Sequence, residues 1–396
     1  RSTDGAASLE ASETVVPGVW YSNHHRALKY KFSTHQFSLF RQIRLHFGVA
    51  DEEFQRSLCT HRSIRAAVVG EGSPGPSQFY FFSRDGKFVL RPIRTSDFLQ
   101  LQGLLPAYLA HLRNGNFDTL LPHFLGLFTI QLEGHAPVRL VGVNNVLFSG
   151  GRALVHRYEL TGASRRRYVV PDPEDSRSVV LKDHNFSTLG LVHEGRGEYQ
   201  YPVASNKLQV GPDIRRSLLP QLKRDCVWLE RQNLVNYSLI VGVVPDAPPQ
   251  HPPGGWKDVG SAAGGVARGP GPHEQGYGAV NPTDQDDLVC WVPSSGNPAD
   301  DMRFAWSFAA LEGASSQATE EGDASSVTIS LPGARGETYL IGIADVFQEY
   351  TTMDELTHRC ETLFSCVTGA QPSAMSVVPP REYSARFYHY VSQNTV

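Results

Sequence analysis

The stretch QFYFFSRDGKFVLRPI (residues 78–93) decides the fold class, because it has the pattern of two β-strands joined by a tight turn. Its two arms are rich in aromatic and β-branched residues and meet at Asp85-Gly86, a dipeptide that accepts positive φ in a two-residue turn. The stretch therefore predicts a β-hairpin, and with it an antiparallel sheet.

Helices and strands are expected on both sides of this hairpin. Residues 37–49 and 51–59 carry apolar side chains three and four positions apart, which predicts two short helices. The runs HFLGLFTIQL (123–132) and VRLVGVNNVLF (138–148) have the composition of strands. Helices packed on an antiparallel sheet give an α+β fold.

A longer helix should follow the hairpin directly. Ser96-Asp97 is expected to cap its beginning, and Asn114-Gly115 is expected to end it. The predicted apolar face consists of Phe98, Leu101, Leu105, Tyr108, Leu109 and Leu112.

The second half of the chain alternates ordered segments with polar ones. A helix over 213–233, kinked at Pro220, should be followed by a strand over 237–244. Towards the C-terminus the sequence predicts an apolar strand from 337 that ends at Asp345, and helices over about 352–366 and 381–393.

Composition divides the chain into lobes and insertions. The predicted parts are a polar N-terminal extension (1–17), an N-terminal lobe (18–150) and a C-terminal lobe (151–396), with a Pro/Gly-rich insertion at about 245–281 and a polar one at about 310–326. The insertions have too few aliphatic residues to fold alone. They are interpreted as flexible surface segments, with an arm that lies along a partner as the alternative.

The charge and cysteine content of the chain argue against several classes of protein. A formal charge of -4 provides no general attraction to nucleic acid, and the longest apolar run is too short to cross a bilayer. Five scattered cysteines without a C-x-x-C pair argue against a disulfide framework and a zinc site. We expect an intracellular, reducing compartment, either cytoplasmic or organellar after removal of a presequence.

Seven short motifs occur in one order along the chain. They are SPGPSQFYFF (73–82), KFVLRPI (87–93), YELTGA (158–163), LKDHNF (181–186), VNYSLIVGV (235–243), IGIAD (341–345) and YSARF (383–387). Together they resemble the catalytic domain of the phosphatidylinositol phosphate kinases. The resemblance implies a two-lobed fold, in which an antiparallel sheet with helices forms the N-lobe and a smaller mixed C-lobe follows.

The resemblance also assigns candidate roles. Catalysis of phosphoryl transfer is mainly the placement of ATP, metal and acceptor hydroxyl. Asp345 corresponds to the metal-binding aspartate, and Arg167 matches an arginine that could contact phosphate. For the run Arg165-Arg166-Arg167 the alternative is a solvated or partner-facing surface. The candidate nucleotide-binding residues are Arg91, Lys182, Asp183 and Asn144.

Some conserved-looking positions have a structural alternative. Asp345 could instead be a strand-end carboxylate that accepts backbone hydrogen bonds, and Lys182-Asp183 could be an ion pair that holds the lobe together. Both interpretations stay open at the level of sequence.

The sequence departs from the family pattern at the catalytic positions. Arg91 replaces the phosphate-contacting lysine, and the two side chains are not interchangeable at such a site. Thr161 and Glu159 replace a lysine and an aspartate in the family's Y-D-L-K-G-S motif. Asn236 replaces the carboxylate that acts on the acceptor hydroxyl, and loss of a general base costs ~10²–10⁴ in rate.

These departures favour a pseudokinase that serves as a structural subunit of a larger assembly. No cofactor is then expected, whereas an active enzyme would use ATP and Mg²⁺. The segment EYTTMDELTHRCETL (349–363) is acidic, so binding to phosphoinositides should be weak. The alternatives are a divergent active kinase, in which Asp183 or Glu159 takes over from Asn236, and a regulator of an active paralogue.

Overall fold

The computed structural model describes residues 13–21, 27–59, 64–69, 78–83, 85–116, 118–165, 167–170, 179–188, 204–246, 328–358 and 378–396. Several predicted features lie outside these ranges: the start of the first motif (73–77), most of the Pro/Gly-rich insertion, the whole polar insertion at 310–326 and the end of the helix predicted to reach residue 366. Among the described helices, none combines the length and the apolar character needed to cross a membrane.

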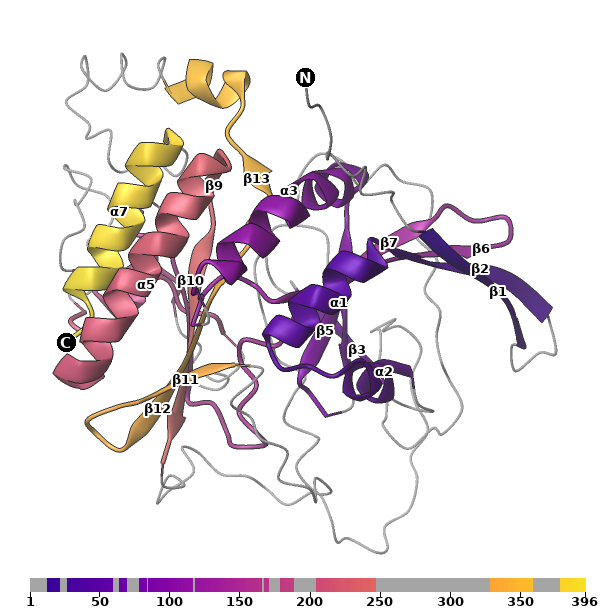
Figure 1. Cartoon of the computed structure of the whole chain (residues 1–396). Coiled ribbons are helices and arrows are strands. Elements are labelled where there is room, and N and C mark those ends of the chain that lie inside the picture. Colours follow the sequence, from indigo (N-terminus) through magenta and orange to yellow (C-terminus); the bar gives the residue numbers. More distant parts are fainter. Residues whose placement is uncertain are drawn as a thin grey trace, which may run out of the picture.

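The N-lobe is built on a seven-stranded antiparallel sheet (Figure 1). Its strands are β1 (Glu13–Tyr21), β2 (Ala27–His35), β3 (Ile64–Val69), β4 (Gln78–Ser83), β5 (Phe88–Ile93), β6 (Phe124–Leu132) and β7 (Val138–Asn144). They lie in the order β1-β2-β6-β7-β5-β4-β3, so the strands on either side of the predicted hairpin are brought next to it by long connections. The expected α+β fold is confirmed.

Three helices pack on this sheet: α1 (Phe37–His46), α2 (Asp51–Cys59) and α3 (Thr95–Arg113). The apolar face predicted for α3 is buried at all six positions. Phe54 of α2 packs edge-on against Phe88 of β5, and Tyr108 of α3 packs edge-on against Phe124 of β6. Aromatic contacts of this geometry fix the helices on the sheet.

Two local predictions in this lobe were wrong in detail. The hairpin connection is longer than two residues, because the Asp85 carboxylate accepts hydrogen bonds from the hydroxyls of Ser57 and Ser83 and so organises a wider loop. Helix α3 begins at Thr95 without a side-chain cap, and Asp97 lies inside its first turn. That carboxylate instead binds Arg94, the residue at the N-cap position.

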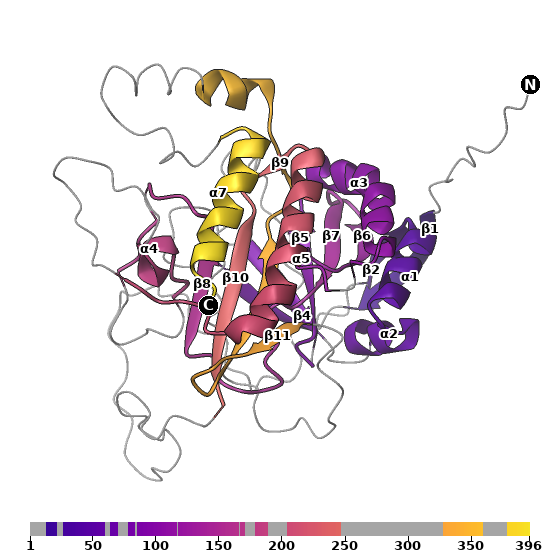
Figure 2. The ribbon, with the colours of Figure 1, turned by 60° about the vertical axis from the view of Figure 1, so that its left-hand side comes forward.

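The C-lobe contains a four-stranded sheet in the order β11-β12-β10-β8. Its strands are β8 (His156–Leu160), β10 (Ser238–Pro245), β11 (Ile329–Pro332) and β12 (Glu337–Ala344), and a separate pair is formed by β9 (Leu234–Val235) and β13 (Gln348–Glu349). The helices are α4 (Asp183–Phe186), α5 (Gly211–Arg231) and α7 (Pro380–Gln393), and residues 352–358 are also helical. Figure 2 shows α5 and α7 side by side over this sheet, and α5 continues through Pro220.

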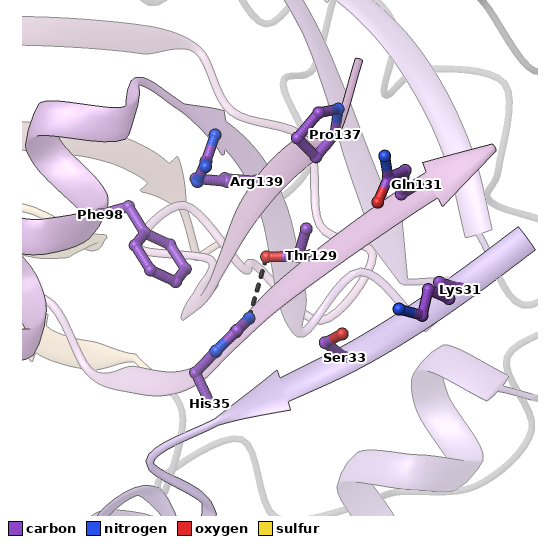
Figure 3. A pocket seen from close by; sticks show the side chains of 8 residues that line it. All are labelled: Lys31, Ser33, His35, Phe98, Thr129, Gln131, Pro137 and Arg139. Atoms are coloured by element: carbon purple, nitrogen blue, oxygen red, sulfur yellow. Dashed lines mark hydrogen bonds between the residues drawn. The ribbon is translucent and has the colours of Figure 1, made fainter. Parts of the chain in front are cut away.

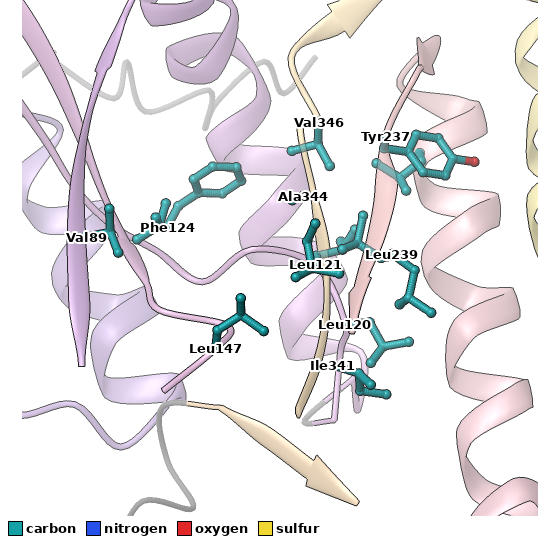
Figure 4. Packing of buried hydrophobic residues seen from close by; sticks show 14 of the residues in the cluster. Val89, Leu120, Leu121, Phe124, Leu147, Tyr237, Leu239, Ile341, Ala344 and Val346 are labelled. Carbon is teal, nitrogen blue, oxygen red and sulfur yellow. The ribbon is translucent and has the colours of Figure 1, made fainter. Parts of the chain in front are cut away.

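The two lobes share one hydrophobic core. Figure 4 shows Val89, Phe124 and Leu147 from the N-lobe side facing Ala344 and Val346 across the junction. All five side chains are buried. The core therefore continues from one sheet to the other.

A glycine permits a close approach at this junction. A Cβ atom at Gly342 of β12 would lie 2.8 Å from Cγ2 of Val146, which belongs to the segment that leaves β7. Real Cβ atoms do not come so close to a neighbouring carbon, so a side chain at Gly342 would push this segment away from the sheet.

A buried carboxylate ties the helices of the two lobes together. Asp225 of α5 is fully buried and accepts hydrogen bonds from Thr119 Oγ1 and Leu120 N, each at 2.8 Å. It also pairs with His111 of α3 and Gln221 of its own helix, both at 2.9 Å. One side chain thus fixes α3, α5 and the segment that leads into β6.

We expect Asp225→Asn to destabilise the protein by about 2–4 kcal/mol, since an amide in this position presents its NH₂ group to donors that need an acceptor. The free energy of unfolding, measured by urea denaturation, tests this. Asp213→Asn is the matched control, because Asp213 lies on the same helix with an exposed side chain. A loss below about 1 kcal/mol for Asp225→Asn would contradict the role assigned to this carboxylate.

Candidate functional site

The predicted site residues gather at one end of the C-lobe sheet. Ser238 and Ala344 are paired directly opposite each other at the ends of β10 and β12. Asn236 precedes the first of these residues by two positions, and Asp345 follows the second. Thr161 comes directly after β8, at the same end of the sheet, because Leu160 pairs with Leu239.

Asp345 forms a buried ion pair with Arg91. The Arg91 Nη1 atom lies 2.9 Å from Asp345 Oδ1, and the two side chains are 5% and 13% exposed. The guanidinium also lies over the ring of Phe347, 5.6 Å from its centroid. Arg91 comes from β5 of the N-lobe, so the predicted nucleotide contact and the predicted metal ligand bind each other across the lobe junction.

The backbone at Asp345 favours this contact. Its φ of 61° lies in the left-handed region, which Asp and Asn tolerate better than most residues. β12 therefore ends in a sharp change of direction at this carboxylate. The Asp345 carboxylate thus stands at the end of β12, with its side chain bound to a cation of the other lobe.

Asn236 also has a left-handed backbone, with a φ of 59°. Its Nδ2 atom donates to Gln348 Oε1 at 2.8 Å. This contact follows from the short β9–β13 pair, in which Val235 is opposite Gln348. The amide at the expected general-base position is thus held by a second amide three residues beyond Asp345.

A second group of charges surrounds Asp183, which is fully buried. Its carboxylate accepts hydrogen bonds from the backbone N–H groups of Thr161 and Gly162, both at 2.7 Å, and from Arg167 Nε at 2.6 Å. Arg167 Nη1 also lies 3.0 Å from Glu159 Oε1. Asp183 therefore holds the turn after β8, and its cationic partner is Arg167.

This arrangement changes the interpretation of two residues. The ion pair that stabilises the lobe at Asp183 involves Arg167 where the sequence suggested Lys182. The Arg167 side chain points into the protein, at two carboxylates and the Glu159 carbonyl, which leaves little of its hydrogen-bonding capacity for a phosphate.

Lys182 and Asn144 complete the predicted set. Burial lowers the pKa of Lys182 from its ordinary value, and the attraction of Glu159 only partly opposes this shift. Asn144 ends β7, and its Oδ1 atom accepts a hydrogen bond from the backbone N–H of His123 at 3.0 Å. The Asn144 side chain therefore joins the end of β7 to the residue before β6.

The sequence analysis missed Gln348 and Phe347. Both contact predicted site residues, but they lie in or beside two-residue strands whose periodicity is too short to detect. The sequence did offer one signal for these two residues, because both follow closely after the IGIAD motif.

Comparison with known proteins agrees with this geometry. A model of the phosphatidylinositol-4-phosphate 5-kinase family matches residues 62–394. A probable phosphatidylinositol phosphate kinase of Dictyostelium discoideum is 28% identical over 99% of this chain and 51% of its own length. A type-1 beta phosphatidylinositol 4-phosphate 5-kinase of Rattus norvegicus is 26% identical over 93% of this chain and 59% of its own length.

A human phosphatidylinositol 5-phosphate 4-kinase type-2 beta is also 26% identical, over 96% of this chain and 81% of its own length. The chain thus spans only about half the length of the first of these relatives. The family match covers the C-lobe sheet, strands β3 to β7 of the N-lobe sheet and every predicted site residue. The chain belongs to the phosphatidylinositol phosphate kinase family.

Proposed function

We propose that this chain is a phosphatidylinositol phosphate kinase fold without catalytic activity, which serves as a structural subunit of a larger assembly. The observation that supports the proposal most is the buried ion pair between Arg91 and Asp345. In the family, the first position should contact nucleotide phosphates and the second should hold a metal ion. Here each side chain neutralises the other.

Binding of nucleotide and metal would have to separate this pair. Magnesium is held by carboxylate oxygens, so Asp345 would have to exchange a guanidinium for the ion. Arg91 would then need a new anionic partner while it remains buried. Breaking a buried ion pair by removal of one partner costs about 3–5 kcal/mol, which the ligand would have to supply.

The general base is missing as well. Asn236 carries an amide, which does not accept a proton, and its NH₂ group is bound to Gln348. The two carboxylates that could replace it, Glu159 and Asp183, both bind Arg167. The guanidinium thus occupies an oxygen of each carboxylate that would otherwise be available to the acceptor hydroxyl.

A structural role is consistent with the rest of the chain. A kinase fold that keeps its core but lacks a working site still presents two lobes of surface to protein partners. We infer that such partners, rather than a lipid substrate, account for the retention of the fold. Binding of phosphoinositides at the acidic segment after β13 would be weak.

An active kinase is the second candidate. Two observations favour it: the metal-binding position Asp345 is retained, and the Lys182 amine, with its lowered pKa, lies near Glu159. The relatives are also named as kinases. In this case Arg91 would leave Asp345 and bind the phosphates of ATP. Regulation of an active paralogue is a third role that the same fold could serve.

Titration with ATP and magnesium distinguishes the first two candidates. Under our proposal, isothermal calorimetry detects no heat of binding up to millimolar nucleotide, because Arg91 and Asp345 stay paired. Saturable binding at micromolar concentration, abolished in Asp345→Asn, would contradict the proposal. A lipid kinase assay with phosphatidylinositol phosphates would then follow.

A double-mutant cycle measures the Arg91–Asp345 pair itself. We expect Arg91→Met and Asp345→Asn each to lower the free energy of unfolding by about 3 kcal/mol, because each leaves a buried group without its partner. The double variant should lose less than the sum, by about 2 kcal/mol or more. Asn at position 345 keeps the left-handed backbone favourable.

The exposed pair of Arg216 and Asp213 on α5 is the control for this cycle, with side chains 77% and 89% exposed. Substitutions there should be additive and nearly neutral. If the Arg91 and Asp345 variants were also additive, the pair could not be what keeps the site closed.

The structural role makes a separate prediction. The full-length protein, purified from its natural source under gentle conditions, should elute in a complex of fixed stoichiometry, as measured by native mass spectrometry. A protein that is monomeric at its cellular concentration would argue against a structural subunit, whatever its catalytic activity.

A further inference from the structure

A hollow lies on the N-lobe sheet, outside the site described above. It has a volume of about 250 Å³ and is lined by Lys31, Ser33, His35, Phe98, Thr129, Gln131, Pro137 and Arg139 (Figure 3). None of the residues considered for catalysis lines it. In Figure 1 this part of the sheet, formed by β2, β6 and β7, extends sideways beyond helix α1.

The strand register places the polar lining on one face of the sheet. Ser33 of β2 pairs with Thr129 of β6, which in turn pairs with Arg139 of β7. Lys31 pairs with Gln131 two residues further along. Since residues that face each other across a ladder point to the same side, all five side chains share this surface.

The wall of the hollow next to α3 is preorganised. The Arg139 guanidinium lies over the Phe98 ring, 5.4 Å from its centroid, and its Nη1 atom donates to Thr95 Oγ1 at 3.0 Å. His35 packs edge-on against the same ring at 4.9 Å and is hydrogen-bonded to Thr129. The arginine therefore has a fixed position before any ligand arrives.

The hollow carries the positive charges of Lys31 and Arg139, which the described residues that line it do not compensate. No carboxylate is among its lining residues, and neither Lys31 nor Arg139 forms an ion pair with any residue that the structure describes. Asp97, next to Phe98 on α3, is bound to Arg94. Arg91 and Arg167 of the candidate site are by contrast paired with carboxylates.

We propose that this hollow binds a phosphate monoester. A planar guanidinium and a lysine ammonium neutralise its two charges, and hydroxyl and amide donors from Ser33, Thr129 and Gln131 complete its hydrogen bonds. The volume is below the range of about 300–1,000 Å³ that drug-sized ligands occupy, so the hollow fits one small phosphorylated group. That group can be a free ester or the head group of a lipid.

The first probes are glycerol 3-phosphate in solution and phosphatidylcholine vesicles that contain phosphatidylinositol 4-phosphate, with vesicles of equal charge made with phosphatidylserine as reference. Binding of the soluble ester is followed by calorimetry and that of vesicles by co-sedimentation. We expect saturable binding to at least one phosphate monoester and weaker binding to the phosphatidylserine vesicles.

Two variants test the location. Lys31→Glu changes an exposed strand residue, and Arg139→Gln removes the charge of the fixed guanidinium; each should weaken binding at least about tenfold. Arg231→Glu is the control, because it makes the same charge change as Lys31→Glu at an exposed position of α5, in the other lobe. Its affinity should stay within about twofold of the unaltered protein, since salt screens distant charges.

The outcomes are distinct. Binding of the soluble ester that depends on Lys31 and Arg139 supports a free ester as ligand, and vesicle binding with the same dependence supports a lipid head group. Absence of binding to both probes would overturn the proposal, as would equal losses in Lys31→Glu and Arg231→Glu. Thermal unfolding of each variant shows whether it is folded. Arg139→Lys is a second test at that position, because lysine keeps the positive charge but lacks the planar, forked guanidinium.

Discussion

The buried carboxylate of Asp225 is the constraint on which the geometry of the site depends. It accepts a hydrogen bond from the backbone N–H of Leu120 and so fixes that residue. The Leu120 carbonyl in turn accepts a hydrogen bond from Ile343 N in β12 at 2.6 Å. Ile343 lies two residues before Asp345. A side chain on α5 therefore determines where β12 ends relative to the N-lobe, and so whether Asp345 can meet Arg91.

This chain of contacts explains why the lobe junction and the site behave as one unit. The hydrophobic core that crosses the junction holds β5 against the end of β12, so Arg91 has little freedom to turn away. A buried guanidinium requires a partner, and among the described residues the carboxylate that pairs with it is the one expected to bind metal. Under the proposed assignment, replacement of lysine by arginine affects the expected metal position as well as the expected nucleotide position, because the longer, forked side chain reaches across to Asp345.

A structural feature could be predicted from the sequence where a single periodic pattern determined it. The buried face of α3 could be predicted because it repeats over five turns, and the motif order identified the family. The start of α3 and the hairpin loop could not, since the local preference of Asp97 and Asp85 for capping and turns competes with tertiary partners.

The partners within the site were equally inaccessible to sequence reasoning. Arg167 and Asp183 are 16 residues apart, and nothing in either motif indicates that they bind each other. Arg91 and Asp345 are separated by 254 positions. The candidate residues could therefore be named from the motifs. Which side chain each of them binds, however, depends on how β5, β8 and β12 are brought together.

The distribution of paired and unpaired arginines connects the two proposals. Inside the protein, Arg91 and Arg167 are each paired with a carboxylate, and these internal pairs neutralise charge at the candidate site. On the surface of the N-lobe sheet, Arg139 of β7 is held by an aromatic ring and a hydroxyl, neither of which neutralises it. Arg139 therefore keeps its positive charge available for an anion at the surface of the sheet, whereas Asp345 neutralises the charge of Arg91 at the lobe junction. A kinase active site requires the opposite distribution of charge.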